Sequence, residues 1–291
     1  MRVRAFAKIN LSLHVLGKRA DGYHELRTIF QSIALHDTLT IRRVRGPLRL
    51  VCDDPACPSD RTNLVWRAAE RVWKASGRSG APRDVAIQLA KRIPVQAGLG
   101  GASSDAAAAI RALGALWRVD ARRQREIGAA LGADVPYFFE GGTVLGLERG
   151  DLLFPLIDEP AAIVVLVLPA FGVSTADAFA WFDNARSSVD PSTRSGSSRA
   201  ESRDEASKGE RTNDLEPVVA QRHPEIARIV AALRRQGAGH AAMTGSGSAV
   251  FGLFASRGDA ARAAAAVRPL GHRTLVTRTL ARSAYRRLAA N

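Results

Sequence analysis

Hydrophobic and polar side chains alternate along the first sixteen residues of the chain. The apolar Ile9, Leu11 and Leu13 are interleaved with the polar Lys8 and Asn10. A period of two predicts a β-strand with one buried face. Further strands are predicted at residues 23–33, 39–41, 48–51, 85–89, 141–147, 163–168 and 274–279.

Apolar residues at helical spacing predict helices between these strands. In the segment 62–73, Val65, Ala69 and Val72 fall on one face. Asp120 is a good N-cap residue for another helix. The remaining helices are predicted at 106–117, 224–236 and 260–267.

Between residues 186 and 213 the composition changes to serine, arginine and acidic residues. Such a segment contains too little apolar surface to bury a core. We therefore expect a disordered surface insert at 186–213.

A glycine-rich segment precedes one of the predicted helices. Gly98, Gly100 and Gly101 permit backbone angles that side chains forbid, and they leave no Cβ between the main chain and a ligand. Ser103 and Ser104, which follow, are helix-capping residue types. A helix start carries unpaired N–H groups and the positive end of the helix dipole, so it attracts phosphate. The segment predicts a phosphate-binding loop, and the alternative is a tight turn with a small-residue helix packed behind it.

Two other nucleotide-binding motifs do not fit the chain. No Gly-x-x-x-x-Gly-Lys-Ser/Thr sequence occurs, which excludes the Walker loop. Gly237, Gly239 and Ala242 have the spacing of a dinucleotide-binding fingerprint. They follow a helix-like stretch rather than a strand, so we discount them.

Composition narrows the class of protein. The chain has 291 residues, of which 46% are hydrophobic and 24% charged, a balance typical of soluble globular proteins. The longest apolar run is strand-sized, and Lys8 falls where a signal peptide needs apolar residues. We therefore expect a cytoplasmic protein without a membrane partner. Cys52 and Cys57 have no second pair that would complete a zinc site, so we expect free thiols.

The formal net charge of the chain is +14. Such a charge is typical of proteins that bind nucleic acid and of enzymes whose substrates are anionic. The arginines are scattered along the sequence, and a solvated helix face explains the spacing of Arg278, Arg282 and Arg286. The charge alone does not decide between the two classes.

Two charged residues have apolar or small neighbours. Lys8 interrupts the first strand, and Asp134 lies between a helix end and Pro136. A lysine near a strand end usually points to solvent, and an aspartate in such a position often caps a turn. The local sequence leaves both these structural roles and a catalytic role open.

Three separated segments together resemble the motifs of the GHMP superfamily of small-molecule kinases, which includes galactokinase, homoserine kinase and mevalonate kinase. These segments are residues 7–11, 94–104 and 243–247. The resemblance covers essentially the whole chain and implies an α+β fold of two domains. An N-terminal, ribosomal-protein-like domain would span 1–155 and a C-terminal α/β sandwich domain 156–291, with ATP and substrate in the cleft between them.

The resemblance also implies the residues of the site. Asp134 is the expected base, and Lys8 is expected beside it to keep it ionised and to polarise the attacking hydroxyl. Mg²⁺ is expected to bridge the phosphates with the Ser104 hydroxyl near it. The implied ATP-binding residues are Pro94, Val95, Gln96, Ala97, Gly98, Leu99, Gly100, Gly101, Ala102, Ser103 and Ser104.

The Asp-Gly-Tyr-His sequence at 21–24 resembles one member family, whose kinases act on a cytidine-diphosphate-linked methylerythritol in the non-mevalonate route to isoprenoid precursors. The resemblance implies transfer of the ATP γ-phosphate to the 2-hydroxyl of that unit. It also implies that Tyr23 stacks on the cytosine ring and that His24 forms a hydrogen bond with it. Asn10 is expected nearby, and Phe179 is the candidate for a second stacking ring.

Two other hypotheses remain beside this one. Another GHMP kinase would act on a different alcohol, which Tyr23, His24 and Phe179 argue against. A basic RNA-binding protein is the second, because the first domain of these kinases shares its topology with ribosomal proteins. The phosphate loop with Lys8 and Asp134 argues against RNA binding. We therefore expect a small-molecule substrate, no nucleic acid, and a monomer or weak homodimer.

Overall fold

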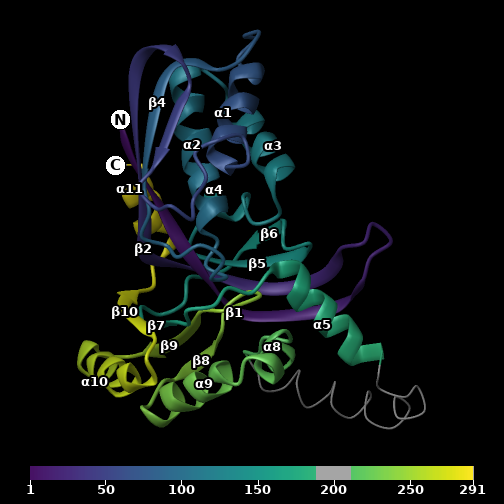
Figure 1. Ribbon diagram of the computed structural model, residues 1–291, viewed down its shortest axis with the longest axis vertical. Coiled ribbons are helices and arrows are strands. Elements are labelled where there is room, and N and C mark those ends of the chain that lie inside the picture. Colours follow the sequence, from purple (N-terminus) through teal and green to yellow (C-terminus); the bar gives the residue numbers. More distant parts are fainter. Residues whose placement is uncertain (188–210, 291) are drawn as a thin grey trace.

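The protein is described here by a computed structural model that covers residues 1–187 and 211–290. Its elements form two sheets with helices packed against them (Figure 1). The six-stranded sheet has the order β3-β4-β2-β5-β6, with β1 paired to β2. Its strands are β1 (Arg2–Lys18), β2 (His24–Pro47), β3 (Arg49–Cys52), β4 (Arg83–Ala90), β5 (Thr143–Glu148) and β6 (Leu152–Pro155).

The long antiparallel pair of β1 and β2 is the centre of this sheet. A single strand, β2, replaces the separate strands predicted at 23–33 and 39–41. β4 and β5 pair with different parts of β2 along one edge, while β1 follows the other edge. The register of β1 against β2 shifts around Lys8 and again just after Asn10. Such bulges redirect side chains, and both of these polar residues are buried here.

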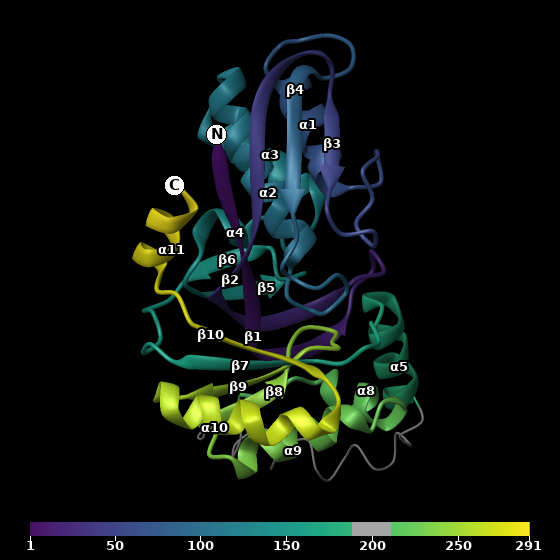
Figure 2. The same ribbon diagram turned by 60° about the vertical axis from the view of Figure 1, so that its left-hand side comes forward.

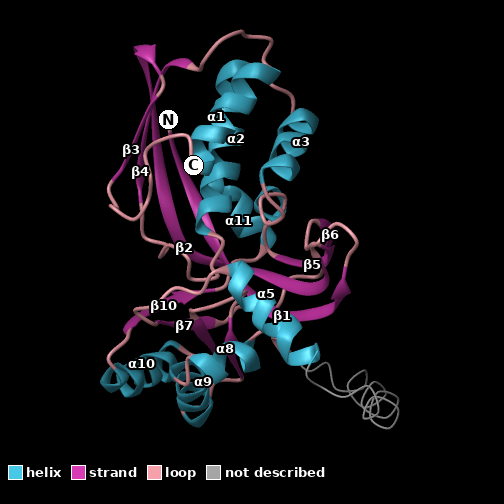
Figure 3. Ribbon diagram, turned by 45° about the vertical axis from the view of Figure 1, so that its right-hand side comes forward, coloured by secondary structure: helices cyan, strands magenta, loops and turns pink. Residues whose placement is uncertain are grey.

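Three helices pack beside the six-stranded sheet. They are α1 (Leu64–Ala75), α2 (Gly101–Trp117) and α3 (Ala121–Leu131), and the short α4 (Tyr137–Glu140) follows them. α2 packs on β1 and β2, and α1 and α3 pack on α2 (Figure 3). The alanines at 106–109 of α2 are fully buried, so small side chains let this helix lie close to its neighbours.

Two helix starts differ in how well they were predicted. Asp120 caps α3, and its side chain accepts a hydrogen bond from a backbone amide, which confirms its predicted role. α2 begins at Gly101, after Gly100 in a left-handed conformation and without a side-chain cap. Ser103 and Ser104 therefore lie inside the first turn, and their predicted capping role is wrong.

The second sheet has four strands in the order β10-β7-β9-β8. They are β7 (Ile163–Leu168), β8 (His240–Met243), β9 (Val250–Phe254) and β10 (Arg273–Arg278). On one face lie α9 (Glu225–Arg235) and α10 (Arg257–Val267), as Figure 2 shows. On the other face, Ile9 and Leu11 of β1 share a core with Leu166 and Phe251. The predicted domain boundary after residue 155 falls between β6 and β7 and stays a prediction, because β1 contacts both sheets.

The remaining elements of the described residues are helical. They are α5 (Thr175–Ser187), α8 (Glu216–Arg222), the 3₁₀ helix Arg268–Leu270 and α11 (Arg282–Ala289). α11 returns to β1, which brings the C-terminal helix close to the six-stranded sheet (Figure 1). No helix within residues 1–187 and 211–290 is long and apolar enough to cross a membrane.

Two sequence-based expectations need correction. Most of the insert predicted at 186–213 lies outside the described residues, but Asn213 is buried and belongs to the fold. The arginines at 278, 282 and 286 do not share one solvated row. Arg278 ends β10, whereas Arg282 donates hydrogen bonds to the carbonyls of Thr143 (2.7 Å) and Leu156 (3.1 Å).

His240 makes the stability of the fold depend on pH. Its Nε2 donates to the Leu11 carbonyl at 3.1 Å, and burial, with Arg211 and Arg234 nearby, lowers its pKa to about 4. The unfolded chain, with a histidine pKa of about 6.5, binds this proton first as the pH falls. The contribution to stability is therefore complete above pH 6.5 and is lost as the pH falls toward 4, by about 3 kcal/mol.

We expect His240→Gln, which retains an N–H donor but does not titrate, to lose less stability between pH 7 and pH 4 than the unaltered protein. Urea unfolding at several pH values measures this difference. Equal pH dependence in the two proteins would contradict the assignment to His240.

Candidate active site

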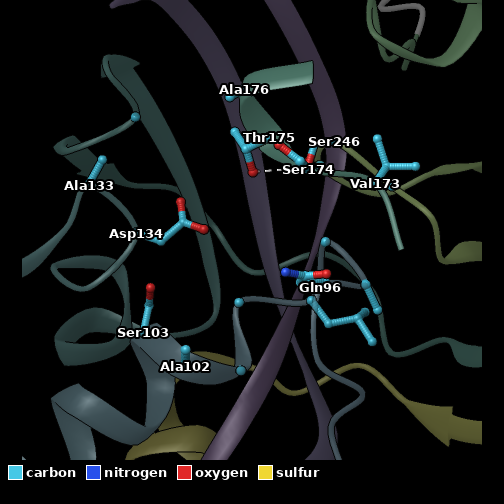
Figure 4. A pocket seen from close by; sticks show the side chains of 18 of the residues that line it. Gln96, Ala102, Ser103, Ala133, Asp134, Val173, Ser174, Thr175, Ala176 and Ser246 are labelled. Atoms are coloured by element: carbon cyan, nitrogen blue, oxygen red, sulfur yellow. Dashed lines mark hydrogen bonds between the residues drawn. The ribbon is translucent and has the colours of Figure 1, made fainter. Parts of the chain in front are cut away.

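A cavity of about 1070 Å³ lies where the glycine loop, β1, β2 and α5 meet. Residues 94–103 line it, together with Lys8, Asn10, Asp134 and the aromatic residues predicted for the substrate, Tyr23, His24 and Phe179. Figure 4 shows Ser103 and Asp134 pointing toward the same space from different elements. The structure thus brings the predicted site residues together around one cavity, with the exception of Ser104.

The conformation of the loop before α2 requires glycine. Gly98 and Gly100 have positive φ angles of 73° and 71°. A Cβ added to Gly98 would lie 2.1 Å from the Thr244 carbonyl oxygen, and one added to Gly100 would lie 2.7 Å from Phe138 Cζ. The lack of a Cβ at these two positions therefore lets other parts of the protein approach the loop. The sequence had predicted that a ligand would occupy this space.

The N-terminus of α2 faces the cavity. The Ser104 amide donates to the Gly100 carbonyl at 2.9 Å, so the amides of residues 101–103 precede the first helical hydrogen bond. Ala102 and Ser103 line the cavity. This arrangement favours an anion at the helix start.

The Ser104 side chain points away from the cavity. It is buried, and its hydroxyl donates to the Phe6 carbonyl at 2.7 Å. The expected metal ligand at this position therefore does not reach the space that the phosphates would occupy. The hydroxyl of Ser103, one residue earlier, does face it.

A buried ion-pair network holds both ends of the glycine loop. Lys91 Nζ contacts the carboxylates of Asp37 and, at 2.7 Å, Asp105. Asp37 also accepts a hydrogen bond from the Ile93 amide at 2.8 Å. Burial alone would lower the pKa of Lys91, but the two carboxylates raise it above its usual value. Because these residues belong to β2, α2 and the loop entry, the network fixes the loop against the sheet.

A second glycine loop, at residues 244–247, closes on the first. The Thr244 hydroxyl accepts a hydrogen bond from the backbone amide of Asn10 at 3.0 Å and donates one to the Gly98 carbonyl at 3.3 Å. The side-chain amide of Asn213 donates to the carbonyls of Met243 and Gly245, both at 2.8 Å. The two loops thus form one rim of the cavity.

Lys8 carries a buried charge at the base of the cavity. Its Nζ donates to Asn10 Oδ1 at 2.6 Å and lies 3.7 Å from Asp134 Oδ2. The Lys8 side chain is 5% exposed, whereas that of Asp134 is 37% exposed. Burial lowers the pKa of Lys8, and Asp134 opposes this effect. The side-chain amide of Asn10 donates a hydrogen bond from Nδ2 to the Thr28 hydroxyl at 2.8 Å. This bond orients the side chain so that its Oδ1 faces the Lys8 ammonium.

The aromatic residues lie at the end of the cavity beside α5. Phe179 stacks on His24, with ring centroids 4.5 Å apart and an angle of 17° between the planes. Tyr23 is 55% exposed, and the Arg149 guanidinium lies 5.1 Å from its ring centroid. In this arrangement Phe179 stacks directly on His24, and Tyr23 lies under Arg149.

Several cavity residues were missed by the sequence analysis. Lys18 and Asp183 contact each other at 2.9 Å, and Thr175 contacts Ser246 at 3.2 Å across the cavity rim (Figure 4). Lysine is rare in this chain, which was the only sequence signal for Lys18. At the opposite end, residues 56–58 and 62–64 also line the cavity.

The cysteines are free thiols, as predicted. Cys57 borders the cavity, and burial raises its pKa to about 12. Within the described part of the chain, no group of three or more His, Cys, Asp or Glu side chains could hold a metal ion.

Comparison with known proteins defines the class to which this fold and site belong. The family model for the GHMP kinases N terminal domain matches residues 63–142, and that for the GHMP kinases C terminal matches residues 197–272. Both halves of the chain therefore carry the signature of GHMP kinases, which are small-molecule kinases.

Individual relatives narrow the class. A 4-diphosphocytidyl-2-C-methyl-D-erythritol kinase from Moorella thermoacetica is 43% identical over 286 residues, which cover 95% of this chain and 98% of the relative. One from Solibacter usitatus is 44% identical over 297 residues, with 98% and 92% covered. A crystal structure of 4-(cytidine 5'-diphospho)-2C-methyl-D-erythritol kinase has a TM-score of 0.75 and 35% identity, over 96% of this chain and 99% of that one. The chain belongs to the family of 4-diphosphocytidyl-2-C-methyl-D-erythritol kinases, with the α+β fold of GHMP kinases.

The contact between the two glycine loops can be tested at Gly98. Gly98→Ala places a methyl group against the Thr244 carbonyl, whereas Gly77→Ala, at a similar φ of 78°, meets no atom within 4 Å. Both changes cost about 1–2 kcal/mol for the left-handed conformation. We expect Gly98→Ala to lower the free energy of unfolding by about 1–3 kcal/mol more, because of overpacking.

Urea unfolding of the two variants measures this difference. An equal loss in both would show that the two loops do not constrain each other.

Proposed function

We propose that the protein transfers the γ-phosphate of ATP to the 2-hydroxyl of 4-diphosphocytidyl-2-C-methyl-D-erythritol and releases ADP. Membership of the kinase family gives the reaction class. The observation that carries the proposal is the cavity that joins the glycine loop, the Lys8–Asp134 pair and the His24–Phe179 pair. A phosphate site, a base and an aromatic site for a nucleobase are thus in reach of one bound substrate pair.

Asp134 is the proposed acceptor of the hydroxyl proton. Its carboxylate is the partly exposed member of the pair, so a substrate hydroxyl can approach it. Lys8, 3.7 Å away, offers positive charge to the attacking oxygen and the transferred phosphoryl group. The hydrogen bond from Lys8 to Asn10 fixes the ammonium in place, so little reorganisation is needed during transfer.

The glycine loop and the start of α2 are the proposed phosphate site. The amides of residues 101–103 and the Ser103 hydroxyl face the cavity, where they can donate to phosphate oxygens. Gly245 and Gly247 border the same region from the second loop. The rest of ATP extends toward residues 56–64, because the opposite end of the cavity holds the aromatic pair.

Mg²⁺ fits this site as an ion carried by the nucleotide. Magnesium is commonly held by one or two protein oxygens together with phosphates and water, and the described residues offer no larger acidic cluster. The Ser103 hydroxyl is the proposed protein ligand, in place of Ser104. Bound there, the ion neutralises charge on the phosphate oxygens.

The His24 end of the cavity is the proposed cytosine site. Tyr23 and Phe179 supply aromatic faces and His24 supplies hydrogen-bonding groups, whereas both side-chain polar atoms of Asn10 are engaged by Lys8 and Thr28. An ADP-release assay with ATP and Mg²⁺ tests this assignment with three alcohols: the cytidine substrate, mevalonate and homoserine. We expect turnover with the cytidine substrate alone. Turnover with either of the other alcohols instead would reject the cytosine site but retain the kinase mechanism.

The role of Asp134 predicts a specific kinetic defect. Asp134→Asn preserves the shape of the side chain but removes the base, so we expect kcat to fall by about two to four orders of magnitude while ATP still binds. Steady-state kinetics and ATP titration measure the two quantities. Asp120→Asn is the matched control, since asparagine also caps a helix and the charge change lies away from the cavity. Near-normal turnover of Asp134→Asn would remove this residue from the mechanism.

A further inference from the structure

The turn between β1 and β2 lies near α5 (Figures 1 and 3), and residues of both line the cavity. Here His24 Nε2 lies 2.8 Å from Asp183 Oδ1, and Lys18 Nζ donates to Asp183 Oδ2 at 2.9 Å. All three residues line the cavity, but among the described residues the bonding partners of Lys8 are Asn10 and Asp134 rather than any member of this cluster. This cluster therefore needs an explanation other than phosphate transfer.

The His24 ring has little freedom to move. Its side chain is 9% exposed, and Phe179 stacks on one face at 4.5 Å while Asp183 binds one edge. A side chain held in this way presents a fixed edge to a ligand. The direction and type of its hydrogen bonds are then determined by which ring nitrogen carries the proton.

Asp183 determines which ring nitrogen of His24 carries the proton. Burial alone would raise the pKa of Asp183, but hydrogen bonds from Lys18 and His24 outweigh it and lower the pKa. An ionised carboxylate only accepts hydrogen bonds, so the Nε2 that faces it must carry a hydrogen. In the neutral ring, Nδ1 is then an acceptor.

The Nδ1 atom is available to a ligand. It has no hydrogen-bond partner among residues 1–187 and 211–290, and it is not one of their buried polar atoms that lack a partner. An acceptor at this position matches the exocyclic amino group of cytosine, which donates. Uracil has a carbonyl oxygen at the same ring position, and this acceptor would be repelled by the Nδ1 acceptor of His24.

We propose that Asp183 is a positioning residue that fixes the Nε2–H tautomer of His24 and thereby makes the cavity select cytosine over uracil. The inference rests on the proposed function, which places the base of the substrate at the His24 end. It adds a residue that discriminates between two bases through another side chain.

Binding of cytidine diphosphate and uridine diphosphate to the full chain, measured by titration calorimetry, tests the selection. Asp183→Asn allows both tautomers, because an amide can accept from Nε2–H or donate to a bare Nε2. We expect the preference of the unaltered protein for the cytidine compound to fall about tenfold in this variant. Asp177→Asn makes the same charge change at an exposed position of α5 and should keep the preference.

The tautomer can be read directly, without substrate, from a long-range ¹H–¹⁵N spectrum of the histidine rings. The chain contains six histidines, and the His24 signals are those lost in His24→Gln. We expect the Nε2–H form in the unaltered protein and a mixture of both forms in Asp183→Ala. A purely structural role of Asp183 would leave the tautomer unchanged.

The possible outcomes separate this inference from the proposed function. If the unaltered protein prefers cytidine diphosphate, Asp183→Asn retains that preference and Asp183→Ala retains the tautomer, the role of Asp183 is overturned and the kinase assignment stands. If the unaltered protein binds neither nucleotide, the cytosine site itself is overturned, and the selection by Asp183 with it.

Discussion

The buried ammonium of Lys8 is the interaction on which the arrangement of the cavity depends. A charge removed from water is tolerated only where polar and oppositely charged groups surround it. Asn10 and Asp134 provide these groups, at 2.6 and 3.7 Å. Asn10 is held in turn by the hydroxyls of Thr28 and Thr244, which belong to β2 and to the second glycine loop. Stabilising one charge therefore fixes the relation between the first strand, Asp134 and the second glycine loop.

The same constraint explains why β1 contacts both sheets. Its polar face carries Lys8 and Asn10 toward the cavity, while Ile9 and Leu11 pack into the core shared with the second sheet. The six-stranded sheet and its helices supply the glycine loop and the Lys8–Asp134 pair. The part of the chain after β6 supplies the closing loop and α5, with Phe179 on it. The proposed sites of substrate recognition and phosphate transfer thus lie in different parts of the chain, and β1 contacts both.

The sequence predicted the parts of the site that depend on backbone pattern or spacing. Alternation predicted β1, the glycines predicted the loop, and the family resemblance joined Lys8 to Asp134, whose roles the local sequence left open. Side-chain direction was harder, because Ser103 and Ser104 are adjacent and identical in type, and the start of α2 at Gly101 decides which one faces the cavity. α5 was missed because Ala178 is its only fully buried residue within the described helix, so its apolar period is weak. Asp183 could not be paired with His24 without that helix.

A double-mutant cycle on kcat tests the central claim most directly, namely that Lys8 and Asp134 act as one unit. Lys8→Met preserves the length of the buried stem, and Asp134→Asn removes the proposed base. Groups that act as a unit show strongly non-additive effects, whereas independent groups show effects that multiply. The account predicts that the double variant is about as slow as the slower single variant. A double variant slowed by the product of the two single factors would contradict it.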